Sequence, residues 1–256
     1  MKSARALPNG REVENAAGRH WLVEEPLSQI WSGADAISKR LVTHNGRKEV
    51  RPQQHFELTI LDRHLPRSAM FVDLETCGFA GSAVFLIGIV HHHQEQLTLR
   101  QLLARNYAEE RSILQAYWDV ASDQHALVSF NGKCFDWPML LDRTTLHHLP
   151  HRVPEPFVHC DLLHHARRKW KDWLPNCKLQ TLERYICGRR RVGDIPGRDI
   201  PQAYHDYVRN GDAWEIRSIL HHNALDLVTL VQLSLGLLGS PQASYLEDQG
   251  AGSKGS

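Results

Sequence analysis

Asp73 and Glu75 stand two positions apart inside a short apolar run, Ala69-Met-Phe-Val-Asp-Leu-Glu-Thr76. Successive side chains of a β-strand point to opposite faces, so residues two apart project from the same face. Two buried carboxylates repel each other, and a divalent cation is the usual group that compensates them. The pattern therefore predicts a metal-binding strand. The alternative is an edge strand whose acidic face is simply solvated.

Two further aspartates stand where other elements begin or pack. Asp136 follows the apolar run 125–130 and opens a segment with helical spacing. Asp226 lies inside an apolar helical segment, and His222, four positions earlier, shares its helical face. Each has a plain structural explanation as well. Asp136 can stabilise a helix N-terminus, and His222 with Asp226 can form an ordinary surface pair.

Together the four acids have the composition of a site for two divalent cations. Such ions lie about 3.5–4 Å apart and require several carboxylates from different elements, because Mg²⁺ and Mn²⁺ take oxygen ligands. Hydrolysis of a phosphodiester also needs a water deprotonated near neutral pH, and histidine is suited to that transfer. The candidate catalytic residues are Asp73, Glu75, Asp136, Asp226, His221 and His222.

The elements that position these residues alternate between strand and helix. Apolar runs typical of strands occupy residues 69–76, 83–90, 96–103, 125–130 and 157–163. Helical spacing occupies residues 108–122, 136–149, 178–187 and 212–238. Short linkers predict an antiparallel meander of the first three strands, and the helix before the fourth allows a parallel crossover. We therefore predict an α/β fold with a mixed five-stranded sheet flanked by helices.

Composition places the chain among globular proteins, with 42% hydrophobic and 23% charged residues over 256 positions. We expect a partly ordered N-terminal extension over residues 1–65, a main domain over 66–240 and a flexible Gly/Ser-rich tail over 241–256. No apolar run reaches membrane-spanning length, and the N-terminus lacks the apolar core of a signal peptide. Five cysteines without a C-x-x-C pair argue against a disulfide framework or a zinc ribbon. These features predict a cytoplasmic protein.

Basic residues concentrate in one segment. Between His164 and Arg191 there are nine Lys/Arg against two Asp/Glu, a net charge of +7 within a chain of net charge +1. Trp170 and Trp173 are interleaved with these cations, which suits phosphate contacts combined with base stacking on a single strand. The alternative is a solvated helix face whose tryptophans point into the core. Candidate phosphate contacts in this segment are Arg167, Arg168, Lys169, Lys171 and Arg189 to Arg191.

The motifs resemble those of DEDD-type exonucleases, which have a ribonuclease H-like fold. Asp73-Leu-Glu75, Asn131-x-x-x-Phe-Asp136 and a histidine four or five positions before Asp226 look like the three motifs of that superfamily. The resemblance is closer to the bacterial ribonuclease H-like domain family named for YprB, and it covers roughly residues 20–240. It is carried by Phe71-Val-Asp-Leu-Glu-Thr76, Phe130-Asn-Gly-Lys-x-Phe-Asp-Trp-Pro138, Asp194-Ile-Pro-Gly197 and His222-Asn-x-x-Asp226.

The resemblance implies that the four acids ligate two cations, Mg²⁺ or Mn²⁺, while a nearby histidine activates water. His221 and His222 occupy the two positions at which the superfamily carries its acid-base residue. On a regular helix, His222 lies about 40° from Asp226 around the axis and His221 about 140° away. We therefore expect His222 to be the acid-base residue. Asp161 also matches a family position, and we interpret it as a supporting residue.

The expected function is that of a metal-dependent 3′–5′ exonuclease that hydrolyses single-stranded DNA or RNA from a 3′ end. Two alternatives remain open. One is an inactive domain of the same fold that binds nucleic acid or acts as a scaffold, and the other is an endonuclease. The sequence indicates no membrane association and no stable protein partner. Candidate nucleic-acid-binding residues are Asn131, Lys133, Phe135, Arg167, Arg168 and Lys171.

Overall fold

A seven-stranded mixed sheet forms the centre of the computed structural model, which describes residues 7–31, 33–43, 55–78 and 81–239. The strands are β1 (Arg11–Asn15), β2 (Gly18–Pro26), β3 (Ala69–Thr76), β4 (Val84–His93), β5 (Gln96–Leu103), β6 (Ala126–Ser129) and β7 (Val158–Asp161). Their order across the sheet is β1-β2-β5-β4-β3-β6-β7. The predicted α/β class and mixed sheet are confirmed, with two strands more than the five expected. The expected tail over 241–256 lies outside the described residues.

Strand β3 lies between an antiparallel and a parallel neighbour. It pairs with β4 in the predicted antiparallel hairpin, β5 extends the meander, and β6 runs parallel to β3 on its other side. The first four residues of β3, Ala69 to Val72, are buried, and the last four are half-buried. The apolar first half of β3 thus anchors the acidic second half of the same strand.

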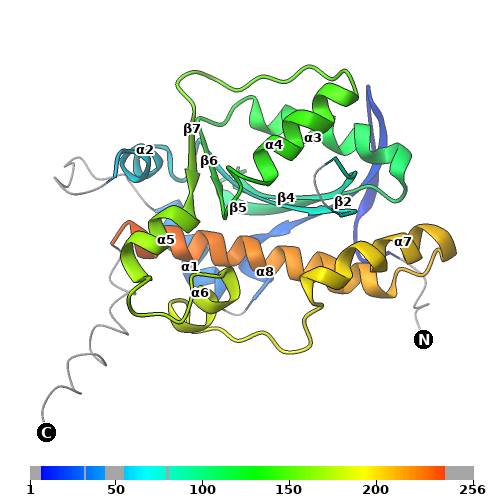
Figure 1. Ribbon diagram of the computed structural model, residues 1–256. Coiled ribbons are helices and arrows are strands. Elements are labelled where there is room, and N and C mark those ends of the chain that lie inside the picture. Colours follow the sequence, from blue (N-terminus) through cyan, green and yellow to red (C-terminus); the bar gives the residue numbers. More distant parts are fainter. Residues whose placement is uncertain (1–6, 32, 44–54, 79–80, 240–256) are drawn as a thin grey trace, which may run out of the picture.

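Helices cover both faces of the sheet (Figure 1). They are α1 (Ala34–Val42), α2 (Phe56–His64), α3 (Glu110–Ala121), α4 (Asp136–Leu146), α5 (Leu162–Trp170), α6 (Leu179–Tyr185), α7 (Ile200–Asn210) and α8 (Trp214–Leu237). The 24-residue helix α8 crosses one face, and α3 lies on the other. Phe71 accordingly packs in a core cluster with Leu227, whereas its neighbour Met70 packs with Ile113. Within the described ranges, no helix is long and apolar enough to cross a membrane.

The N-terminal hairpin continues the sheet. Strand β2 pairs antiparallel with β5, and β1 pairs with the outer side of β2. His20 of β2 is buried, and its Nδ1 lies 2.8 Å from Ser112 Oγ of α3. Residues expected to form an extension therefore contribute strands to the central layer. The domain boundary at residue 65 stays a prediction.

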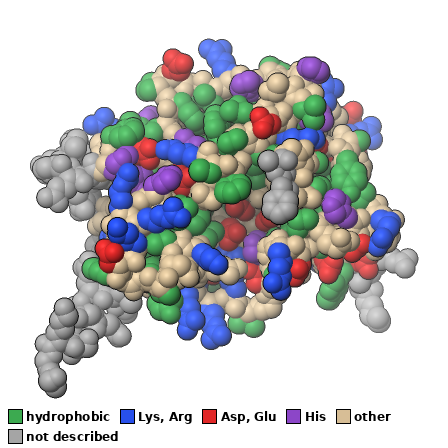
Figure 2. Space-filling model, in the orientation of Figure 1, with side chains coloured by type: hydrophobic (Ala, Val, Ile, Leu, Met, Phe, Trp, Pro, Cys, Tyr) green, Lys and Arg blue, Asp and Glu red, His purple; other side chains and the backbone are tan. Residues whose placement is uncertain are grey.

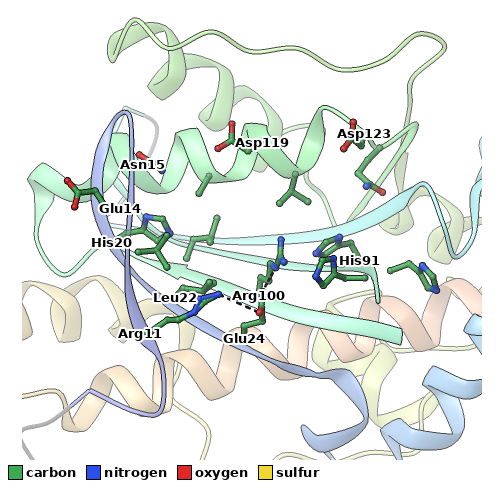
Figure 3. A pocket seen from close by; sticks show the side chains of 17 residues that line it. Arg11, Glu14, Asn15, His20, Leu22, Glu24, His91, Arg100, Asp119 and Asp123 are labelled. Atoms are coloured by element: carbon green, nitrogen blue, oxygen red, sulfur yellow. Dashed lines mark hydrogen bonds and ion pairs between the residues drawn. The ribbon is translucent and has the colours of Figure 1, made fainter. Parts of the chain in front are cut away.

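A pocket opens between α3 and strands β1, β2, β4 and β5 (Figure 3). Arg11 and Arg100 both turn toward the carboxylate of Glu24, and Arg100 Nε donates to it over 2.5 Å. Strand β4 contributes His91, which is paired with Met70 on the α3 side of the sheet. The pocket and the acids of β3 therefore lie on opposite faces of the sheet.

Candidate active site

Strand β3 directs Asp73 toward helix α8. The Asn223 side chain of α8 donates from Nδ2 to Asp73 Oδ2 over 2.8 Å and to the Asp73 carbonyl over 3.1 Å. Because Glu75 is two residues further along the same strand, its side chain projects from the same face. The strand therefore presents both carboxylates to the helix that carries the fourth acid.

Gly88 permits this close approach of helix and sheet. It lies opposite Asp73 on β4, where an added Cβ would be 2.1 Å from Asn223 Oδ1. On the next strand, Gln101 Nε2 donates to Asn223 Oδ1 over 3.0 Å and to the Leu220 carbonyl over 2.7 Å. Asn223 is fully buried, so these bonds fix its amide and, through it, Asp73. The sequence motif contained Asn223, but nothing in the pattern identified its partners.

Helix α4 begins at Asp136, directly after a loop that is held by Asp161. The buried Asp161 carboxylate accepts the backbone N–H groups of Asn131 (2.8 Å) and Lys133 (3.2 Å) and also caps α5. Gly132 passes so close to the site that an added Cβ would lie 3.1 Å from Asp136 Oδ2. This geometry agrees with the supporting role expected for Asp161. The loop brings Asp136 beside β3.

Helix α8 carries Asp226 and the two candidate histidines. His222 is buried, and its Nε2 lies 3.4 Å from Asp226 Oδ2, whereas His221 is exposed. The other ring nitrogen of His222, Nδ1, lies 2.9 Å from Asp194 Oδ2 and 3.0 Å from Asp194 Oδ1. The regular helix therefore turns His222, and not His221, toward the fourth acid. Asp194 is a partner that helical spacing does not reveal, because it belongs to the loop before α7.

Arg191, in the same loop, joins three carboxylates. Its Nη2 donates to Asp226 Oδ1 and, over 2.7 Å, to Glu183 Oε2, while Nη1 donates to Asp194 Oδ2 over 3.1 Å. The Arg191 side chain is only 7% exposed. Arg189, two residues earlier, is also buried and contacts Glu183 and Thr229. Both arginines are therefore unavailable for the phosphate contacts expected of them.

Burial dominates the electrostatics of the four acids, and repulsion between them adds to it at Asp73 and Glu75. Burial raises the pKa of Asp73, and the charges of Asp226, Glu75 and Asp136 raise it further. Burial also raises the pKa of Glu75, again with contributions from Asp226 and Asp136. The pKa of Asp136 rises to about 7, chiefly through burial, and that of Asp226 rises although Arg191 opposes the shift. The fold thus gathers four carboxylates that destabilise one another when ionised.

This donor set fits a divalent metal. Four carboxylates from β3, α4 and α8 offer the oxygen atoms that hard cations prefer, and a cation would relieve their repulsion. A separate group, His55, Glu57 and His165, has ligand atoms within 4.8 Å of one another. There, however, Lys133 Nζ already lies 2.6 Å from Glu57 Oε1. Lys133, expected to touch nucleic acid, is thus engaged with α2.

The other expected nucleic-acid contacts lie at the surface. Phe135, next to Asp136, is 66% exposed, and Asn131 is half-buried. In α5 and just after it, Trp170 is buried and points into the core, whereas Trp173 is exposed, so base stacking stays a prediction for Trp173 alone. Arg167, Arg168 and Lys171 are exposed. Figure 2 shows Lys and Arg side chains gathered over α5, beside a recessed group of acidic side chains near the centre of this face.

The sequence model of the RNase_H superfamily matches residues 70–237, which include all four acids and His222. The chain belongs to this superfamily. Among curated proteins, YprB of Bacillus subtilis (strain 168), described as uncharacterized, is 36% identical over 168 residues, which confirms the predicted YprB-type domain. That match covers 64% of this chain and 40% of YprB, so the chain spans less than half of its relative.

A solved structure supports the fold of this RNase H-like domain. The family B DNA polymerase of the archaeon Pyrobaculum calidifontis superposes with a TM-score of 0.56 at 16% sequence identity. The superposition covers 70% of this chain and 27% of the polymerase. At this identity the likeness concerns the fold alone. The superfamily match and the superposition together support a nuclease-like fold.

The raised pKa of Asp136 predicts how stability depends on pH without metal. A carboxyl whose pKa is about 7 when folded, against 3.8 for the free group, stabilises the fold below pH 4, and this contribution is lost as the pH rises through 7. Asp136→Asn removes this titration. We expect the stability of the variant relative to wild type to increase from pH 4 to pH 8, measured by urea unfolding in EDTA. A flat difference, like that of the exposed control Asp172→Asn, contradicts the prediction.

Proposed function

We propose that the chain is a metal-dependent 3′–5′ exonuclease of the DEDD type that hydrolyses single-stranded nucleic acid. The observation that carries the proposal is the convergence of four half-buried carboxylates from three elements, with His222 against one of them. Asp73, Glu75, Asp136 and Asp226 would hold two divalent cations, Mg²⁺ or Mn²⁺. Bound there, such ions supply charge stabilisation to the phosphodiester and acidify water.

His222 is suited to accept the proton of the attacking water. An ionised Asp194 carboxylate can only accept a hydrogen bond, so His222 Nδ1 carries the proton in this contact. In the neutral imidazole Nε2 is then the unprotonated atom, and it faces Asp226. Asp194 therefore holds the ring in the tautomer and orientation of a general base.

Substrate contacts in the proposal come from exposed groups around the acids. The exposed ring of Phe135 directly precedes Asp136 and can stack on the base of a terminal nucleotide. The cations of α5, with the exposed Trp173, can follow the phosphate backbone of a single strand. This arrangement favours an open strand as substrate.

The direct test is a nuclease assay of wild type and Asp73→Asn. With end-labelled single-stranded DNA and RNA, we expect wild type to shorten the strand from its 3′ end with Mg²⁺ or Mn²⁺ and not in EDTA. Asp73→Asn should abolish hydrolysis. In EDTA its melting temperature should be at least that of wild type, because the substitution removes a charge that the neighbouring acids repel. Activity in EDTA or in this variant contradicts the proposal. Cleavage of a circular strand indicates an endonuclease, and binding without cleavage an inactive domain.

The adjacent histidines provide a matched pair of variants. His222→Ala should lower kcat by roughly two to four orders of magnitude with little change in KM, since it removes the proton acceptor but no substrate contact. His221→Ala, at an exposed position one residue away, should cost far less. Steady-state kinetics on one oligonucleotide measures both. The reverse ranking would assign the proton transfer to His221.

The basic helix predicts a salt-dependent contribution to binding. Replacing Arg167, Arg168 and Lys171 by Gln should weaken single-strand binding and reduce the slope of log K against log salt by roughly two, about 0.7 for each lost phosphate contact. Fluorescence anisotropy of a labelled strand over a salt series measures this slope. The control replaces three exposed arginines elsewhere, Arg19, Arg111 and Arg152, with the same change of charge. Equal slopes in the two variants would make α5 an ordinary solvated face.

A further inference from the structure

The guanidinium of Arg191 is built into the acid site from the side of the loop. It is bonded to Asp226, which is a proposed metal ligand, and to two acids outside the metal set, Glu183 and Asp194. Its positive charge also acts on Glu75, where it lowers a pKa that burial raises. Arg191 is thus a cation inside a group of acids that otherwise repel one another.

Arg191 and His222 lie against the same two carboxylates. Both contact Asp194, and both contact Asp226, so the four side chains form a closed ring between the loop and α8. Glu183 holds Arg191 from outside this ring through three contacts of 2.7–3.0 Å. The guanidinium therefore keeps two carboxylate partners even when its bond to Asp226 is broken.

We propose that Arg191 is the internal counter-ion of Asp226 and that a divalent cation at the acid site competes with it for this carboxylate. The competition rests on the proposed function, whereas the pairing itself does not. In the absence of metal, Arg191 compensates Asp226 and holds α8 beside β3. When a cation binds, Arg191 retains Glu183 and Asp194, which keep His222 oriented while Asp226 turns to the metal.

The physical basis is reciprocal coupling between two cations at one carboxylate. If a metal weakens the Arg191–Asp226 bond by some factor, Arg191 weakens metal binding by the same factor. Removing the guanidinium charge then has two opposite effects. The metal-free protein loses stability because Glu183, Asp194 and Asp226 lose a partner, and the affinity for metal increases because the competitor is gone.

The test compares Arg191→Gln with Arg189→Gln. Arg189 is an equally buried arginine of the same loop, and it contacts Glu183 and Thr229. Its Cζ atom also lies over the ring of Trp31, 5.0 Å from the ring centroid. Both variants should melt at a lower temperature than wild type in EDTA. Calorimetric titration with Mn²⁺ should show roughly tenfold tighter binding only for Arg191→Gln, and Mn²⁺ should raise its melting temperature more. Mn²⁺ affinity that is unchanged or weaker in Arg191→Gln overturns the competition.

A second measurement in EDTA separates the counter-ion from the metal. Asp226→Asn should lower the free energy of unfolding in wild type, where it leaves the buried Arg191 guanidinium with one carboxylate partner fewer, and raise it in the Arg191→Gln background, where it removes an uncompensated charge. The same sign in both backgrounds refutes the pairing. If the sign of the Asp226→Asn effect reverses between the two backgrounds but the wild-type protein does not bind Mn²⁺, the proposed function and the competition are refuted. The pairing of Arg191 with Asp226 is then still supported.

Discussion

The repulsion among carboxylates gathered in a half-buried site is the constraint on which the site depends. Each ionised acid raises the cost of ionising its neighbours, so the fold must hold them together by contacts made elsewhere. Two apolar clusters, one of which contains Met70 and Val72 of β3 and the other Phe71, supply that force. They fix β3 against α8. The apolar residues of these two elements therefore determine where their acidic side chains lie. The ionised acids of such a site repel one another, and a bound cation can relieve this repulsion.

Within the protein, a neutral side chain partly compensates the negative charge of one acid and a cationic side chain that of another. Asp73 accepts a hydrogen bond from the side-chain amide of Asn223, and Gln101 in turn donates to Asn223. A side chain at position 88 would collide with Asn223 Oδ1, so these contacts depend on Gly88. Asp226 instead receives a full positive charge from Arg191. Neutralising Asp73 therefore only removes repulsion, whereas neutralising Asp226 also leaves a buried guanidinium with one partner fewer. Two acids of one site thus differ in what their replacement does to stability.

The fold and the four acids could be predicted because they follow from short-range regularities. The period of two along β3 places Asp73 and Glu75 on one face, and the period of 3.6 along α8 separates His222 from His221. The partners in loops could not be predicted in this way. Asp194 and Arg191 meet α8 across a loop between α6 and α7, and no periodicity links them to Asp226. The hairpin β1–β2 was underestimated because Arg11–Asn15 is largely polar and is placed by its pairing with β2.

The basic segment shows why composition alone could not separate binding residues from structural ones. Its excess of positive charge divides between two environments. Arg167 and Arg168 stand on the outer face of α5, whereas Arg189 and Arg191 turn inward to Glu183 and the acids of α8. The inward arginines supply positive charge where the acids need it, and the outward ones leave a cationic surface beside the same acids. Charge segregation along this chain therefore produces both internal counter-ions and an exposed cationic surface, and only the direction of each side chain distinguishes the two.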